Sequence, residues 1–113
     1  MLINGKQRDF MFTVGAYSKI ANLCPDRNIM RLPEVLNEGN ENLIQNFMRI
    51  AVILNEQSEN YKKYNEEEFN KPLSIEELEM MSIDEFPILI KEILSALSDG
   101  QKTEVEIESS KKN

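Results

Sequence analysis

The sequence has 113 residues with a net charge of −7 at neutral pH, one cysteine and no histidine. This length fits one domain with one core, and the acidic charge disfavours nucleic-acid phosphates and anionic lipid headgroups as partners. Histidine is the commonest general base and metal ligand, and a lone cysteine forms no internal disulfide. We therefore predict a cytoplasmic protein that binds neither nucleic acid nor membranes.

The first predicted element is a β-hairpin, because Asn4-Gly5 accepts the positive φ angles of a tight turn. It stands between 1–3 and an aromatic-rich run, 10–12. The residues expected to face the core are Ile3, Phe10 and Phe12. Those expected to stay in water are Lys6, Gln7 and Arg8. Since a lone hairpin is marginally stable, it should lie against helices.

The next predicted element is a helix over 14–23, capped by Thr13 and ended by Pro25. Its apolar stripe, close to the helical period, is Val14, Tyr17, Ile20, Ala21 and Cys24. We interpret Cys24 as a small apolar residue, because it has no histidine partner for thiolate chemistry. A loop over 26–31 and a short helix with Pro33 in its first turn should follow.

The strongest helical pattern follows a predicted cap at Asn40. Its apolar residues cover more than half the helix circumference: Leu43, Ile44, Phe47, Met48, Ile50, Ala51, Ile53 and Leu54. Such a helix lies either in the core or partly against a partner, and we favour the core. The polar composition of 55–71 predicts an exposed extension through Tyr61, followed by a loop whose aromatic residues keep an interaction role open.

Two further helices are predicted. Ser74 and Glu77 form a capping box that opens a helix through Met81. Ser82 or Asp84 caps the last helix, and Asp84 is preferred because it places Pro87 in the first turn. The stripe of the last helix is Phe86, Ile90, Ile93, Leu94 and Leu97. Gly100 is expected to end this helix, and the polar tail 101–113 is expected to be disordered.

The predicted fold is thus mainly α, with a short N-terminal β-hairpin and about five helices in one domain over residues 1–100. No catalytic, cofactor or metal motif is present in the sequence. Glu66, Glu67 and Glu68 lie in the most polar segment, and Glu76, Glu77 and Glu79 complement a helix macrodipole. Paired-acid catalysis also needs a walled cleft, which this length hardly provides. We therefore expect no enzymatic activity.

An interaction role is favoured by the six methionines, which supply adaptable apolar surface. In one helix, Met80 and Met81 would lie about 100° apart, so both could not face one core. The predicted partner-binding residues are Phe47, Met48, Met80 and Met81. The alternative function is an acidic protein inhibitor or nucleic-acid mimic, which would need carboxylates along one face.

Two segments resemble the start of the tail assembly chaperones of long-tailed bacteriophages and prophages: Leu2-Ile3-Asn4-Gly5-Lys6 and Phe10-Met11-Phe12-Thr13-Val14-Gly15-Ala16. The helix start Leu73-Ser74-Ile75-Glu76-Glu77-Leu78 also looks like that family. The similarity covers roughly residues 1–98. The polar segment 55–71 departs from it, since it is longer than the family pattern.

The resemblance implies a non-enzymatic assembly factor in the cytoplasm of a bacterial host, absent from the mature virion. Such proteins bind the long helical tape-measure protein while tail-tube subunits polymerise around it. The tape-measure protein and the tail-tube protein are therefore the expected partners. Self-association into rings or filaments is a further implication of the resemblance, as is a longer frameshifted form.

Overall fold

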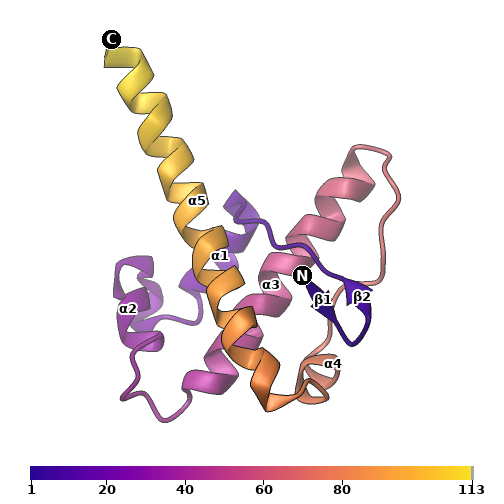
Figure 1. The fold of residues 1–113 in the computed structure, drawn as a ribbon. Helices are drawn as coiled ribbons and strands as arrows, with labels where there is room; N and C mark the ends of the chain where they lie inside the picture. The colour runs from indigo at the N-terminus through magenta and orange to yellow at the C-terminus, as the bar shows by residue number, and fades with distance from the viewer. Residues whose placement is uncertain (113) are drawn as a thin grey trace.

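The structure is a computed structural model that describes the backbone of residues 1–112 and the side chains of residues 1–99. It confirms the predicted fold class: a mainly helical domain with an antiparallel N-terminal hairpin (Figure 1). The elements are β1 (Leu2–Ile3), β2 (Lys6–Gln7), α1 (Val14–Ala21), α2 (Leu32–Val35), α3 (Leu43–Tyr64), α4 (Ile75–Glu79) and α5 (Phe86–Lys112). Three 3₁₀ turns join them: η1 (Pro25–Arg27), η2 (Ile29–Arg31) and η3 (Ile83–Glu85).

Helix α3 is central, because α1, α4 and α5 all pack against it (Figure 1). The buried core is apolar and is built mainly from β1, α1, α3, α4 and α5: Ile3, Ala16, Ile20, Phe47, Ile50, Ala51, Leu54, Leu73, Leu78, Leu89, Ile93 and Leu97. Burial of each large aliphatic side chain contributes about 1.5–3 kcal/mol. The core position predicted for the middle helix is therefore confirmed.

The hairpin is present but shorter than predicted. Ile3 pairs with Lys6, and the turn between them has φ angles of 51° at Asn4 and 82° at Gly5. These positive angles are the ones that an Asn-Gly turn requires. The run 10–12 is not a strand: the Met11 amide donates to the Leu54 carbonyl at 3.1 Å, which ties this segment to α3.

Helix α1 begins as predicted, since the Thr13 hydroxyl accepts from the Ala16 amide at 3.1 Å. The predicted stripe is wrong in part, because Ala16 and Ile20 face the core while Val14 and Tyr17 are exposed. Gly15 lies against the Gln57 side chain of α3: a Cβ there would lie 2.6 Å from the Gln57 side-chain oxygen.

The helix starts at α3 and η3 also differ from prediction. Asn42 is the N-cap residue of α3, and the Asn40 side chain instead accepts from the Asn42 amide at 2.8 Å, in a turn before the helix. Ser82, rather than the preferred Asp84, provides a cap: its hydroxyl accepts from the Asp84 amide at 3.3 Å. That cap opens η3, and α5 follows at Phe86.

Helices α4 and α5 depart from prediction at their ends. The Ser74 cap is confirmed, with its hydroxyl accepting from the Glu77 amide at 3.2 Å, but α4 ends at Glu79. Helix α5 continues past Gly100 to Lys112, because a glycine weakens a helix without forbidding it. The disorder expected for the tail 101–113 is not tested and stays a prediction.

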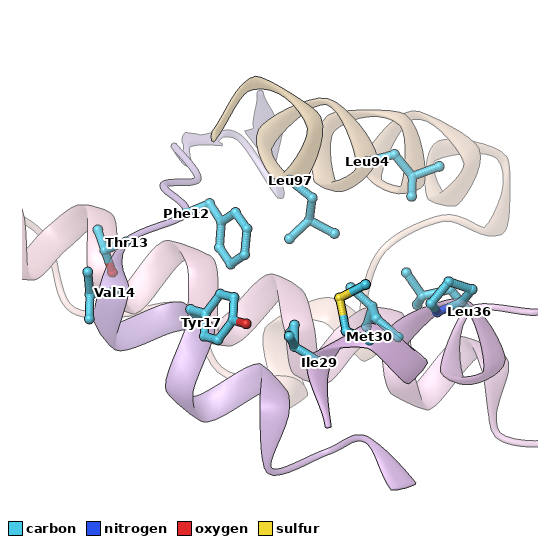
Figure 2. Close-up of a pocket in the computed structure, with 11 residues that line it drawn as sticks. Phe12, Thr13, Val14, Tyr17, Ile29, Met30, Leu36, Leu94 and Leu97 are labelled. Carbon is cyan, nitrogen blue, oxygen red and sulfur yellow. The ribbon is translucent and has the colours of Figure 1, made fainter. Parts of the chain in front are cut away.

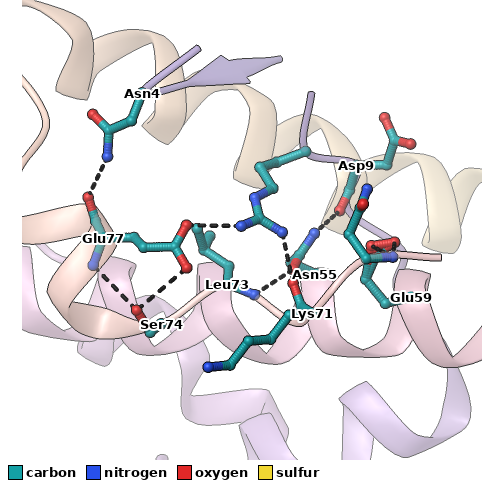
Figure 3. A network of polar contacts seen from close by, with 10 residues as sticks. Asn4, Asp9, Asn55, Glu59, Lys71, Leu73, Ser74 and Glu77 are labelled. Carbon is teal, nitrogen blue, oxygen red and sulfur yellow. Dashed lines mark hydrogen bonds and ion pairs between the residues drawn. The ribbon is translucent and has the colours of Figure 1, made fainter. Parts of the chain in front are cut away.

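The expectation that Arg8 stays in water is wrong, because its side chain is only 3% exposed. One guanidinium nitrogen donates to the Lys71 carbonyl at 2.8 Å, and another pairs with the Glu77 carboxylate at 2.7 Å (Figure 3). A third link runs from the Asn4 side-chain amide to the Glu77 carbonyl at 2.8 Å. The hairpin is thus fastened to the start of α4 by charge-assisted hydrogen bonds.

The helix continues through Tyr61 as predicted, and Tyr61 is exposed, but the opposite face of this second half of α3 is buried. Asn55, Ser58 and Glu59 are buried on one face. The Asn55 side-chain nitrogen donates to the Asp9 backbone carbonyl at 3.0 Å, and the Asn55 side-chain oxygen accepts from the Leu73 backbone amide at 2.8 Å (Figure 3). Asn55 therefore joins three separate segments, and its side chain satisfies two backbone groups that would otherwise lack partners.

Replacing Asn55 with alanine should lower the free energy of unfolding by about 3 kcal/mol. The Leu73 amide would remain buried without a partner, and the Asp9 carbonyl would lose a donor. Urea denaturation measures this loss. Asn60→Ala is the matched control, because Asn60 is exposed on the same helix, and it should change stability by less than about 0.5 kcal/mol. Equal effects of the two variants would contradict the bridging role.

The Asp9 carboxyl gives a pH-dependent contribution to stability. Its pKa is lowered because the Lys62 ammonium and then the Gln7 amide donate hydrogen bonds to the carboxylate. A depressed folded-state pKa stabilises the protein above the unfolded value of about 3.9, and this stability is lost as the pH falls through the folded pKa.

Asp9→Asn should therefore destabilise the protein at neutral pH by less than about 1 kcal/mol, because the ion pair is partly exposed. The difference from the unmodified protein should shrink as the pH falls below the unfolded value of about 3.9 and through the lower folded-state pKa. Urea denaturation at several pH values measures it. A difference that stays constant across this range would refute the assignment to the Asp9 carboxylate.

Candidate docking groove

The four residues predicted to bind a partner do not form one surface. Phe47 is 4% exposed and belongs to the core, so it is not available to a partner in this fold. Met48 and Met81 are half-buried against that core, whereas Met80 is 76% exposed. Phe47 lies on the buried side of α3, in the core on which the other helices pack. Met80 comes directly after the last residue of α4, and its side chain is not packed in the core.

A different apolar surface lies between α1 and α5, where η2 and α2 complete one wall (Figure 2). It is an open groove of about 980 Å³. The residues lining it are mostly apolar: Phe12, Thr13, Val14, Tyr17, Ile29, Met30, Leu32, Pro33, Leu36, Leu94 and Leu97. We call this surface the docking groove. The expectation that the chain is too short for a walled cleft is therefore wrong.

The docking groove exists because its walls carry more apolar positions than their contacts with α3 cover. In α1, Ala16 and Ile20 are buried, and this orientation leaves Val14 and Tyr17 on the groove side. In α5, the buried positions include Ile93, and the adjacent Leu94 is exposed in the groove. Helices α1 and α5 therefore each carry apolar residues on two faces, one packed on α3 and one lining the groove.

The segment before α2 supplies the rest of the same wall. In η2, Met30 is 81% exposed, and Figure 2 shows its side chain on the wall opposite Leu94 and Leu97. At one end of the groove, the Phe12 and Tyr17 rings stack with their centroids 6.2 Å apart. A row of apolar groups therefore runs from the aromatic pair to α2.

The side chains that line the docking groove offer an occupant few hydrogen-bond partners. Among its lining residues, Thr13 and Tyr17 carry the polar side-chain groups. The Thr13 hydroxyl is already engaged, since it accepts from the Ala16 amide and donates to the Gln57 side-chain oxygen at 2.7 Å. The groove can therefore stabilise an occupant mainly through apolar contact.

The charges near α2 are largely paired with one another. The Arg31 guanidinium donates to the Asp26 carboxylate and to the Glu34 carboxylate, each at 2.6 Å. These pairs raise the pKa of Arg31, and the Arg31 guanidinium lowers the pKa of Glu34. Two carboxylates therefore surround one cation at this end of the groove, within a chain whose net charge is −7.

The groups considered for other chemistry lie apart from the docking groove. Cys24 is buried, its thiol donates to the Ile20 carbonyl, and burial raises its pKa. Among the described residues, acidic, histidine and cysteine side chains nowhere gather in threes around a point that could hold a metal ion. None of the described helices combines the length and apolar character of a membrane span.

Sequence reasoning missed the docking groove for an identifiable reason. The sequence predicts a loop over 26–31, which gives Ile29 and Met30 no place in a surface, and it predicts that Val14 and Tyr17 face the core. One signal was available. The helix over 14–23 carries apolar residues both at positions 14 and 17 and at positions 16 and 20, which is more than one contact can bury.

Comparisons with protein-family models, with curated proteins and with solved structures find no match to this chain.

The placement of Phe47 and Met80 can be tested by stability measurements on two alanine variants. Phe47→Ala should lower the free energy of unfolding by about 3–5 kcal/mol, because it opens a cavity in the core. Met80→Ala should change it by less than about 0.5 kcal/mol, since its side chain is exposed. Thermal and urea denaturation measure both. A stable Phe47→Ala variant would show that this ring is not a core residue.

Proposed function

We propose that this protein is a non-enzymatic chaperone that holds an apolar α-helix of another protein in its docking groove. We further propose that its client is the tape-measure protein of a long-tailed phage, bound during tail assembly in the host cytoplasm. The observation that carries the first part is the docking groove itself. The identity of the client is supported by the family resemblance of the hairpin and of the Ser74 helix start.

A helix is the occupant that suits the chemistry of the docking groove. An extended peptide would bury backbone amides and carbonyls against walls that offer almost no partners, and each unsatisfied group costs about 1–3 kcal/mol. A helix satisfies these groups internally and presents an apolar stripe to the groove. Helices α1 and α5 form facing walls of the groove, and none of the lining residues belongs to a β-strand. No strand edge is therefore available there to a β-strand partner.

The charge of the protein favours a client helix with a basic outer face. The net charge of −7 attracts positive segments and increases the rate of encounter. Apolar contact should still provide most of the affinity, so binding should weaken only modestly with salt. Strong weakening by salt would instead favour the alternative function, an acidic inhibitor of a basic enzyme.

The non-enzymatic part of the proposal is supported by the composition of the docking groove. Its lining contains no carboxylate, amine, thiol or imidazole that could act as an acid, a base or a nucleophile. Binding of a tail-tube protein and self-association along the client remain extensions of the same proposal. They are supported by the family resemblance.

Val14→Glu should weaken client binding at least about tenfold, because it places a charge among apolar contacts. Val14 is 88% exposed in the first turn of α1, where an acidic residue complements the helix macrodipole, so the fold should persist. Ile83→Glu is the matched control, since Ile83 is similarly exposed but lies outside the groove, and it should leave affinity within about twofold.

The assay is co-expression with a series of tape-measure fragments, followed by pull-down and by calorimetric titration of the fragments that bind. Retained binding by Val14→Glu would exclude the docking groove as the site. A clean failure of every fragment, alongside binding of an unrelated basic amphipathic helix, would exclude the tape-measure protein and leave the helix-binding function intact.

A further inference from the structure

We propose that Met30 is an oxidation site that closes the docking groove to apolar occupants when its thioether becomes a sulfoxide. Oxidation would thus regulate access to the docking groove. Only the expected effect on binding of a client helix rests on the proposed function. It stands on the position of one side chain within an apolar surface and on the high exposure of that residue.

Met30 is distinguished from the other methionines by both exposure and location. It is 81% exposed and lines the docking groove. Met80 is comparably exposed but lies outside the groove, so it provides an internal control. The remaining methionines are half-buried: Met1, Met11, Met48 and Met81. Because oxidation follows access to the sulfur, Met30 and Met80 should react first.

The chemical step needs a two-electron oxidant such as hydrogen peroxide. A sulfur lone pair attacks one peroxide oxygen, the O–O bond breaks, and the second oxygen leaves as water after it takes up a proton. The sulfur is oxidised by two electrons and the peroxide is reduced to water. Methionine sulfoxide reductases reverse the change, which makes it usable as a switch.

The sulfoxide changes the chemistry of the docking groove because it places a strong hydrogen-bond acceptor on an apolar wall. An occupant that covers residue 30 would remove this oxygen from water. The Thr13 hydroxyl already donates to Gln57, and the other lining residues apart from Tyr17 have no side-chain donor. The buried acceptor should therefore reduce the affinity for an apolar occupant about tenfold.

The experiment compares the unmodified full-length protein with Met30→Leu and Met80→Leu, each before and after limited treatment with hydrogen peroxide. Peptide mass spectrometry follows oxidation at each methionine. The uncharged dye Nile red reports an accessible apolar groove, and a basic amphipathic helix reports client binding. Leucine keeps the apolar volume but cannot be oxidised, so Met30→Leu isolates the effect of the sulfur.

We expect Met30 and Met80 to be oxidised ahead of the half-buried methionines. Dye affinity should then fall about tenfold in the unmodified protein and in Met80→Leu, remain unchanged in Met30→Leu, and recover after reductase treatment. Slow oxidation of Met30, undiminished dye affinity after its oxidation, or an equal loss in Met30→Leu would each overturn the inference. So would a failure of the dye to bind the reduced protein.

The client helix separates this inference from the proposed function. If the helix does not bind the reduced protein while Nile red responds to Met30 oxidation as expected, then the docking function fails and the oxidation-dependent closure stands. If the helix binds equally well before and after Met30 oxidation, then the docking function stands and the closure is refuted.

Discussion

Helix α3 is the surface on which the rest of the molecule is built, and the packing of two helices on it explains the docking groove. Helices α1 and α5 each bury one face against α3. Their remaining apolar positions, including Val14 and Leu94, then border the space between them. With α2 and η2 along one side, this space is the docking groove (Figure 2). Large exposed apolar surfaces of this kind mark interaction sites in soluble proteins.

The same helix has a second, polar role beyond its apolar half. Its buried Asn55 joins the chain at Asp9 to the chain at Leu73, and Arg8 fastens the hairpin to the start of α4 (Figure 3). These contacts lie on the part of the molecule away from the docking groove, and none of their residues lines it. The fold therefore separates a polar region that fixes the chain path from an apolar region that is exposed to solvent.

The sequence predicted several elements from local rules, although it misplaced the caps at Asn40 and Asp84 and the helix end at Gly100. Asn4-Gly5 gives the hairpin and Ser74 gives a cap, because each depends on nearby backbone geometry. It failed where the outcome depends on packing between distant segments. Nothing local shows that Arg8 is buried against Lys71, or that α1 turns Ala16 rather than Val14 towards α3. The candidate site was missed for the same reason: a groove belongs to an arrangement of helices, whereas Phe47 and Met80 were chosen from single segments.

We propose that the docking groove holds a helix of another protein. The decisive measurement is to titrate a basic amphipathic helix into the isotope-labelled protein and to follow backbone and methyl NMR signals. We expect saturable shifts at Val14, Ile29 and Leu94, with the signals of Tyr64 and Phe69 unchanged. Shifts confined to the exposed aromatics of the 61–69 region, with the groove signals unmoved, would contradict it.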